Sequence, residues 1–131
     1  MPDTLRIFGE YAFYECGALT EINLPEQLEE IGAYALQTIT LPAQLTTISD
    51  GMFLYSTSLQ SITLPENITT IERSAFAYCT NLQSITLYDK ISSVGEKVFF
   101  ACDNLTDITV IKDGKEHKFT EIQDALSFLI P

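Results

Sequence analysis

The chain has 131 residues and a formal net charge of −11 at pH 7, and 46% of its residues are hydrophobic. This length suits one domain with a continuous core, and the apolar content excludes an intrinsically disordered chain. The acidic balance opposes nucleic acid binding, which needs lysine and arginine to neutralise phosphates, and it disfavours anionic membrane surfaces. No apolar run approaches the length of a membrane span, and the first residues lack the pattern of a secretory signal peptide.

A repeat of 23 residues organises the chain from its first residues onward. Pro2 and Pro25 are 23 residues apart, as are Pro42 and Pro65. The segments 59–81 and 82–104 align on the unit L-x-x-I-x-L-P-x-x-I-x-x-I-x-x-x-A-F-x-x-C-x-x. A repeat of this length predicts a solenoid, in which each unit buries its apolar face against its neighbours.

Each unit contains three apolar segments. The first alternates as I-x-L, which predicts a strand with one face buried, and it recurs at Ile22/Leu24, Ile39/Leu41, Ile62/Leu64, Ile85/Leu87 and Ile108/Val110. A second pair, such as Ile68 and Ile71, suits a short strand or turn on the opposite side. A third pair, such as Ala75-Phe76, is expected on one helical turn, with its ring closing the core. The pattern predicts a right-handed, curved solenoid of about five rungs with a parallel β-sheet on one face.

These motifs resemble the BspA-like family of leucine-rich repeats, known from bacterial surface proteins and some parasitic protists. The resemblance rests on L-x-x-I-x-L-P, on Ile31-Gly32 and Val94-Gly95, and on Ala75-Phe76 followed by Cys79. It implies a non-catalytic curved solenoid used in adhesion and protein recognition, located outside the cell or on its surface. Two positions depart from the pattern, because Ser56 replaces the cysteine and Tyr88 replaces the proline.

The unit at residues 19–38 is shorter than the others. The interval from Phe53 to Ile62 is nine residues, but the interval from Leu36 to Ile39 is only three. The missing residues include the cysteine and first-leucine positions. Either the loop is simply shortened and closed by local collapse, or the deletion leaves a notch that serves as a binding groove or a hinge.

The first rung begins inside a unit, at Pro2, and no segment is expected to cover it. Open strand edges recruit other chains unless they are blocked. We therefore predict a homodimer through the N-terminal end, with a preceding domain as the alternative. Residues 1–65 carry eight acidic residues and one basic residue, Arg6, so charge repulsion opposes such a dimer.

The chain divides into a leucine-rich repeat domain at 1–111 and a C-terminal cap at 112–131. Asp113-Gly114 predicts the tight turn of a β-hairpin. Thr120 and Gln123 match a capping box, in which Thr120 caps an α-helix and Gln123 reaches back. The apolar stripe of that helix is formed by Ile122, Ala125, Leu126 and Leu129.

No catalytic, metal-binding or cofactor-binding pattern is found. His117 is the one histidine, expected to be solvated in the hairpin, so neither a Ser-His-Asp set nor a zinc site is predicted. Cys79 and Cys102 occupy the same position one unit apart, and the spacing of neighbouring strands alone permits a disulfide. Their parallel side chains favour free, buried thiols instead, and Cys16 is too distant to pair with either.

Two sets of surface residues are candidates for partner binding. The first is the outward strand column, expected to form a flat floor for a protein or glycan: Asn23, Thr40, Thr63, Thr86 and Thr109. Threonine also simply suits an exposed strand. The second set is aromatic: Tyr55, Tyr78, Phe100 and Tyr88. These rings are either interface anchors or packing over the Ala-Phe corner.

The sequence therefore predicts a non-catalytic recognition or adhesion module without a cofactor. Its partner is a protein or a glycan, not nucleic acid, and no membrane insertion is expected. The alternative is a structural spacer or fragment of a longer repeat array whose activity lies elsewhere.

Overall fold

The structure, a computed structural model, describes residues 7–8, 30–31, 38–41 and 43–131. Near the N-terminus, β1 (Ile7–Phe8) pairs with β2 (Glu30–Ile31) in parallel. Most residues of the predicted notch, of the truncated unit at 19–38 and of the N-terminal dimer surface lie outside the described ones, so these hypotheses stay predictions. The total number of rungs stays a prediction for the same reason.

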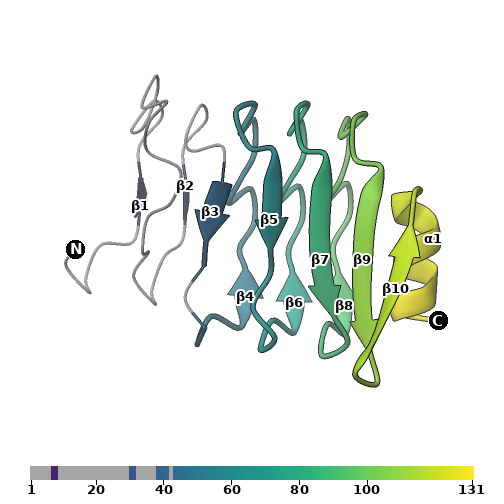
Figure 1. The fold of residues 1–131 in the computed structure, drawn as a ribbon. Helices are drawn as coiled ribbons and strands as arrows, with labels where there is room; N and C mark the ends of the chain where they lie inside the picture. The colour runs from purple at the N-terminus through teal and green to yellow at the C-terminus, as the bar shows by residue number, and fades with distance from the viewer. Residues whose placement is uncertain (1–6, 9–29, 32–37, 42) are drawn as a thin grey trace.

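A larger sheet runs along one face of the solenoid in the order β10-β9-β7-β5-β3 (Figure 1). Its parallel strands are β3 (Thr38–Thr40), β5 (Ser61–Thr63), β7 (Ser84–Tyr88) and β9 (Asp107–Lys112). They pair in the register of the repeat, so that Thr40, Thr63, Thr86 and Thr109 are neighbours in turn. The parallel sheet predicted from the I-x-L segments is confirmed.

A smaller sheet lies on the opposite side of the core, behind the larger one in Figure 1. It contains β4 (Thr47–Ile48), β6 (Thr70–Ile71) and β8 (Ser93–Val94), all parallel. The second apolar pair of each unit thus includes a short strand. Ile48 and Ile71 are fully buried and face the core formed by residues of the larger sheet, such as Ile62 and Ile85.

The Ala-Phe pair lies in a series of turns, which corrects the predicted helical turn. The segment 51–56 contains the equivalent pair Met52-Phe53. The N–H groups of Met52, Leu54 and Ser56 donate to carbonyls three residues back, whereas those of Gly51, Phe53 and Tyr55 donate to carbonyls of the next rung. This alternation excludes a continuous helix, in which every N–H bonds within its own segment.

The phenylalanine of each pair closes the core as predicted. The rings of Phe53 and Phe76 are stacked with centroids 4.9 Å apart, and those of Phe76 and Phe99 are 5.4 Å apart. Phe53 and Phe76 are fully buried. Equivalent side chains therefore pack on one another along the solenoid axis, as a repeat with nearest-neighbour contacts requires.

The C-terminal cap consists of β10 (Lys115–Phe119), antiparallel to β9, and α1 (Ile122–Leu129). Asp113 and Gly114 both have positive φ angles, of 53° and 73°, as the predicted tight turn requires. Ala125 and Leu129 are buried, which confirms the predicted stripe. The capping box is wrong: the N-cap residue is Glu121, whose backbone is extended, and no side chain caps the helix.

Candidate functional site

The exposed face of the larger sheet carries the threonine column. Thr63 is exposed, Thr86 is half-buried and Thr109 is buried, with 7% of its surface accessible. The strand backbone of Thr40 continues the column in register, and Asn23 lies outside the described residues. Among the three threonine side chains described, exposure therefore decreases from Thr63 on β5 to Thr109 on β9.

Lys118 of β10 covers the end of this column. Its Nζ donates to Thr109 Oγ1 at 2.6 Å and lies 3.5 Å from Asp107 Oδ1 and 3.4 Å from Glu116 Oε1. All three charged side chains are more than half exposed, so these ion pairs contribute little to stability. The surface offered beyond Thr86 is therefore charged rather than hydroxylic.

A groove of about 420 Å³ opens where the strands of the larger sheet end, and it brings two sequence candidates together. Thr63 lines it from β5 and the half-buried Tyr88 lines it from β7. Its rim includes Asn67, which donates from Nδ2 to the Ala43 carbonyl at 3.1 Å and accepts from Lys90 Nζ at 3.0 Å. We call this the sheet-end groove.

Tyr55, Tyr78 and Phe100 form an aromatic patch on the turns at the other end of the rungs. They are 50%, 37% and 50% exposed and are the exposed large hydrophobic residues of the described chain. The tyrosine rings stack at 4.7 Å, and Phe100 meets Tyr78 edge-on at 5.5 Å. Lys97 Nζ lies 5.8 Å from the Phe100 ring centre. The patch is separate from Tyr88, so the four aromatic candidates do not form one surface.

The backbone fixes how the patch is presented. Tyr55 and Tyr78 have left-handed φ angles of 61° and 60°, an unusual conformation for a large side chain. Their N–H groups donate to the carbonyls of Ala77 and Phe100 at 3.0 and 2.8 Å. The sequence showed the spacing of the two tyrosines but no signal for this conformation, because glycine and asparagine are its usual markers.

The two described cysteines are free thiols, as predicted. Cys79 Sγ donates to the Phe53 carbonyl at 3.1 Å, and Cys102 Sγ donates to the Phe76 carbonyl at 3.0 Å. The neighbouring Cys102 thiol, together with burial, raises the pKa of Cys79 far above its usual range. Cys79 is therefore a protonated core residue and a poor nucleophile.

His117 is only partly exposed to solvent, which corrects the interpretation of a solvated surface residue. It is half-buried in β10, and its ring centre lies 4.6 Å from that of Phe128 on α1. It therefore belongs to the packing of the cap. Among the described residues, no three His, Cys, Asp or Glu side chains gather so that they could hold a metal ion. Within the same residues, no helix has the length and apolar character needed to cross a membrane.

Two solved structures resemble this chain. One is a leucine-rich cell surface protein from Faecalibacterium prausnitzii A2-165, with 28% sequence identity and a TM-score of 0.56 over 86% of this chain. The other is a leucine-rich repeat protein from Bacteroides ovatus, with 29% identity and a TM-score of 0.58 over 79% of this chain. The matches span only 38% and 28% of those two proteins. No curated protein matches the chain.

The family model of the BspA type leucine-rich repeat region matches in 6 copies, over residues 1–106 and 35–126. The matched segments include every parallel strand of the larger sheet and the stacked phenylalanines of the core. The chain belongs to the BspA-type leucine-rich repeat family.

Proposed function

We propose that this chain is a non-catalytic recognition or adhesion module of a cell-surface protein, and that the aromatic patch is its principal contact for a protein ligand. The observation that carries this proposal is the exposure of Tyr55, Tyr78 and Phe100 side by side. Tyrosine is enriched among the residues that contribute most to binding energy at protein interfaces.

The patch is ordered before a ligand arrives. The stacked tyrosine rings and the hydrogen-bonded backbone of Tyr55 and Tyr78 restrict both side chains in the free protein. A partner therefore meets large apolar surfaces whose immobilisation costs little additional entropy. Lys97, beside Phe100, adds a positive charge that favours an acidic group on the partner.

The sheet-end groove is the second contact in this proposal. Thr63 and Tyr88 offer hydroxyl groups beside apolar surface, an arrangement suited to a polar side chain or a sugar ring. It lies at the opposite end of the rungs from the aromatic patch, so a ligand that uses both sites must cross the face of the larger sheet.

A surface location is supported by the family and by the cell-surface relative from F. prausnitzii. The absence of a catalytic role is supported by the family resemblance, since its repeats are binding scaffolds.

The test is an array of glycans and extracellular matrix proteins probed with the wild-type chain and with Tyr55→Ser/Tyr78→Ser. We expect a matrix protein to bind the wild type, with at least about tenfold weaker binding by the double variant. Tyr88→Phe tests the second contact separately, since it removes a hydroxyl group of the sheet-end groove and leaves the aromatic patch intact. A matrix protein that binds the double variant but not Tyr88→Phe would assign the binding site to the sheet-end groove instead.

The second candidate function is a structural spacer within a longer array. It is favoured by the small share of the two relatives that this chain covers, 38% and 28%. Two results together would support the spacer and contradict recognition through the patch. No glycan or matrix protein would bind the chain in the assay, and the parent protein would keep its full activity after Tyr55→Ser/Tyr78→Ser.

A further inference from the structure

The turn segments of neighbouring rungs are joined by a regular set of backbone hydrogen bonds, which we call the outer ladder. The N–H groups of Gly51, Phe53 and Tyr55 donate to the carbonyls of Arg73, Ala75 and Ala77 at 3.1, 2.7 and 3.0 Å. One rung later, at 3.0, 2.9 and 2.8 Å, the same bonds join Ser74, Phe76 and Tyr78 to Glu96, Val98 and Phe100.

The outer ladder ends unfinished at the last rung. Lys97, Phe99 and Ala101 occupy the donor positions, and by the repeat their acceptors would lie 22 residues further on, as Arg73 lies from Gly51. The chain at that point forms β10 and enters α1 instead of another turn segment. Within the described part of the chain, no acceptor is assigned to these three N–H groups.

The carbonyl groups along the smaller sheet also lose their hydrogen-bond donors at the last rung. The Thr69 carbonyl accepts from the Ser92 and Ser93 N–H groups at 2.9 and 3.3 Å, and the Ile71 carbonyl accepts from Gly95 at 2.8 Å. The equivalent carbonyls one rung later belong to Ser92 and Val94. For the residues described here, no donor is assigned to either of them.

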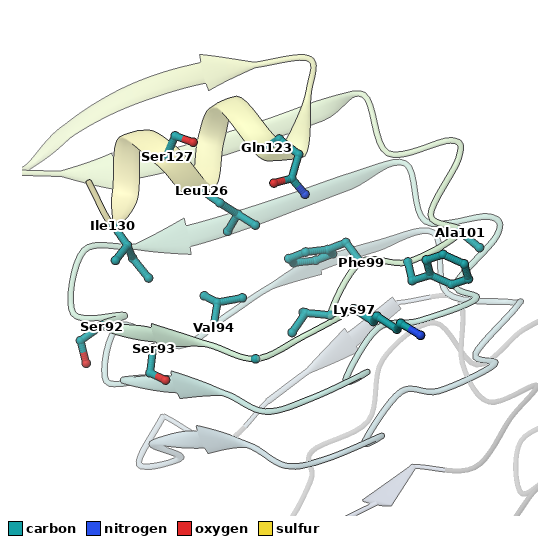
Figure 2. Close-up of a pocket in the computed structure, with 13 residues that line it drawn as sticks. Ser92, Ser93, Val94, Lys97, Phe99, Ala101, Gln123, Leu126, Ser127 and Ile130 are labelled. Atoms are coloured by element: carbon teal, nitrogen blue, oxygen red, sulfur yellow. The ribbon is translucent and has the colours of Figure 1, made fainter.

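A groove of about 820 Å³ lies along this unfinished edge, and we call it the end groove. Residues 92–95 and 97–101 form one wall, and α1 forms the other. Figure 2 shows Leu126 of α1 and Ile130, just after the helix, projecting toward Val94 and Phe99. The helix packs on β9 and β10, so it covers the larger sheet and leaves the edge of β8 open.

We propose that the end groove binds an extended peptide of a partner protein, which adds to β8 and to the following turn as one more rung would. The edge presents two acceptors followed by three donors at alternate residues, the pattern that the backbone of a following rung satisfies, extended beside β8 and turned beside residues 97–101. The stack from Phe53 to Phe99 predicts an aromatic or bulky aliphatic residue over Phe99. Val94 predicts a β-branched residue five positions earlier, by the spacing of Val94 and Phe99.

The repeat itself supplies the probe. A synthetic peptide of residues 68–81 carrying Cys79→Ser, with blocked ends, has the backbone pattern and side chains of a following rung. Its Ile71 would lie on Val94 and its Phe76 on Phe99. At about 1 mM peptide, we expect saturable amide shifts in the ¹⁵N-labelled protein confined to residues 92–101 and to α1. Hydrogen exchange at Lys97, Phe99 and Ala101 should slow at the same time.

Backbone methylation gives a matched pair of control peptides. Within the protein, the Glu72 N–H donates backward to Ile48, whereas the Phe76 N–H donates forward to Val98. Methylation of the peptide nitrogen at Glu72 should therefore weaken binding at least about tenfold, whereas methylation at Phe76 should have little effect. Equal effects of the two modifications would contradict docking in the register of the repeat.

Two protein variants separate this site from the aromatic patch. Leu126→Glu places a charge in the end groove and should weaken peptide binding at least about tenfold, provided that its spectrum shows a folded protein. Tyr55→Ser lies outside the groove and should bind normally. Absent shifts at this peptide concentration, or shifts elsewhere, would overturn the proposal. Concentration-dependent protection of Lys97, Phe99 and Ala101 without peptide would assign the groove to a second copy instead.

Discussion

Three consecutive rungs hold one backbone position in the left-handed region, with φ angles of 66° at Gly51, 57° at Ser74 and 56° at Lys97. Glycine adopts this conformation without steric cost, whereas other residues adopt it at a cost of about 1–2 kcal/mol. Only one of the three rungs has glycine there. The outer ladder, which uses the N–H groups of Gly51 and Ser74, therefore holds a strained residue in the later rung.

The first prediction concerns this position. Ser74→Gly should raise the free energy of unfolding by about 0.5–1 kcal/mol, because it removes the strain and introduces a residue already used one rung earlier. Gly51→Ala should lower it by about 1–2 kcal/mol, although the added Cβ would meet nothing closer than 3.8 Å. Urea unfolding of both variants gives the comparison. A destabilised Ser74→Gly protein would show that the serine side chain, not its backbone, matters.

The second prediction concerns the thiol of Cys79. Its folded-state pKa is raised, so the folded protein holds this proton more tightly than the unfolded chain does. The resulting stability is complete below the ordinary thiol pKa of about 8.5 and decreases above it, by at most about 1.4 kcal/mol per pH unit. The pKa of the neighbouring Cys102 is lowered, mainly by its interaction with Cys79, so this thiol contributes to the pH dependence with the opposite sign. Urea unfolding of Cys102→Ser at pH 7.5 and 9.5 therefore measures the decrease that belongs to Cys79.

Cys79→Ser/Cys102→Ser is the control for this titration, since Ser56 occupies the same position in another rung. The variant should lose most of the pH dependence between pH 7.5 and 9.5. An unchanged pH dependence would assign it to other groups.

At the scale of the elements, Gly95 shows that equivalent positions in a repeat are not equivalent in packing. A Cβ added to Gly95 would lie 2.6 Å from the backbone nitrogen of Arg73, in the preceding rung. Glu72 occupies the same column one rung earlier and carries a full side chain. The close approach therefore belongs to the contact between Gly95 and the Arg73 backbone and does not recur one rung earlier.

The third prediction follows from this contact. Gly95→Ala should destabilise the protein by about 1–3 kcal/mol, because backbone atoms must move to admit the methyl group. Glu96→Ala, at an exposed neighbouring position, should change stability by less than about 0.5 kcal/mol. Thermal unfolding of the two variants measures both effects, and similar midpoints for the two would refute the steric argument.

Asparagine side chains also link the rungs at this scale. Asn81 Nδ2 donates to the Thr57 carbonyl at 2.6 Å, and Asn104 Nδ2 donates to the Thr80 carbonyl at 2.7 Å. Both residues occupy the last position of the repeat unit. They bond across the turns that precede β7 and β9, and so they help to set the register of those strands.

For the whole molecule, the cap and the solenoid share one core. Ala125 and Leu129 of α1 are buried in the same hydrophobic cluster as Ile108 and Val110 of β9. The helix begins without a side-chain cap, so its stability comes from this packing rather than from its own ends.

The fourth prediction tests that coupling. Leu129→Ala should destabilise the protein by about 2–4 kcal/mol, because it removes a side chain that is 5% exposed. Leu126→Ala, at a half-buried position, should cost less. Circular dichroism should show a single unfolding transition for both variants. A separate early transition for Leu129→Ala would mean that the cap melts independently of the rungs.

Much of the fold could be predicted because the repeat displays each core position several times. The columns at Ile62, Leu64 and Phe76 each recur at the next rung, so one periodic pattern gives the strands, their register and the inward side chains. The candidate site was less predictable. Tyr88 and Thr63 share a groove, whereas Tyr55 and Tyr78 lie at the other end of the rungs, and no spacing in the sequence distinguishes these ends.

The sequence by itself determined the family, the parallel sheet, the stacked phenylalanines and the hairpin with its helix, because periodicity, turn residues and an apolar stripe are local or repeated signals. Only the tertiary structure decided the burial of Thr109 under Lys118, the packing of His117 on Phe128 and the close approach at Gly95. It alone also showed the unfinished outer ladder beside α1. Each of these depends on where the cap and the last rung meet, and that contact joins segments whose sequences do not repeat one another.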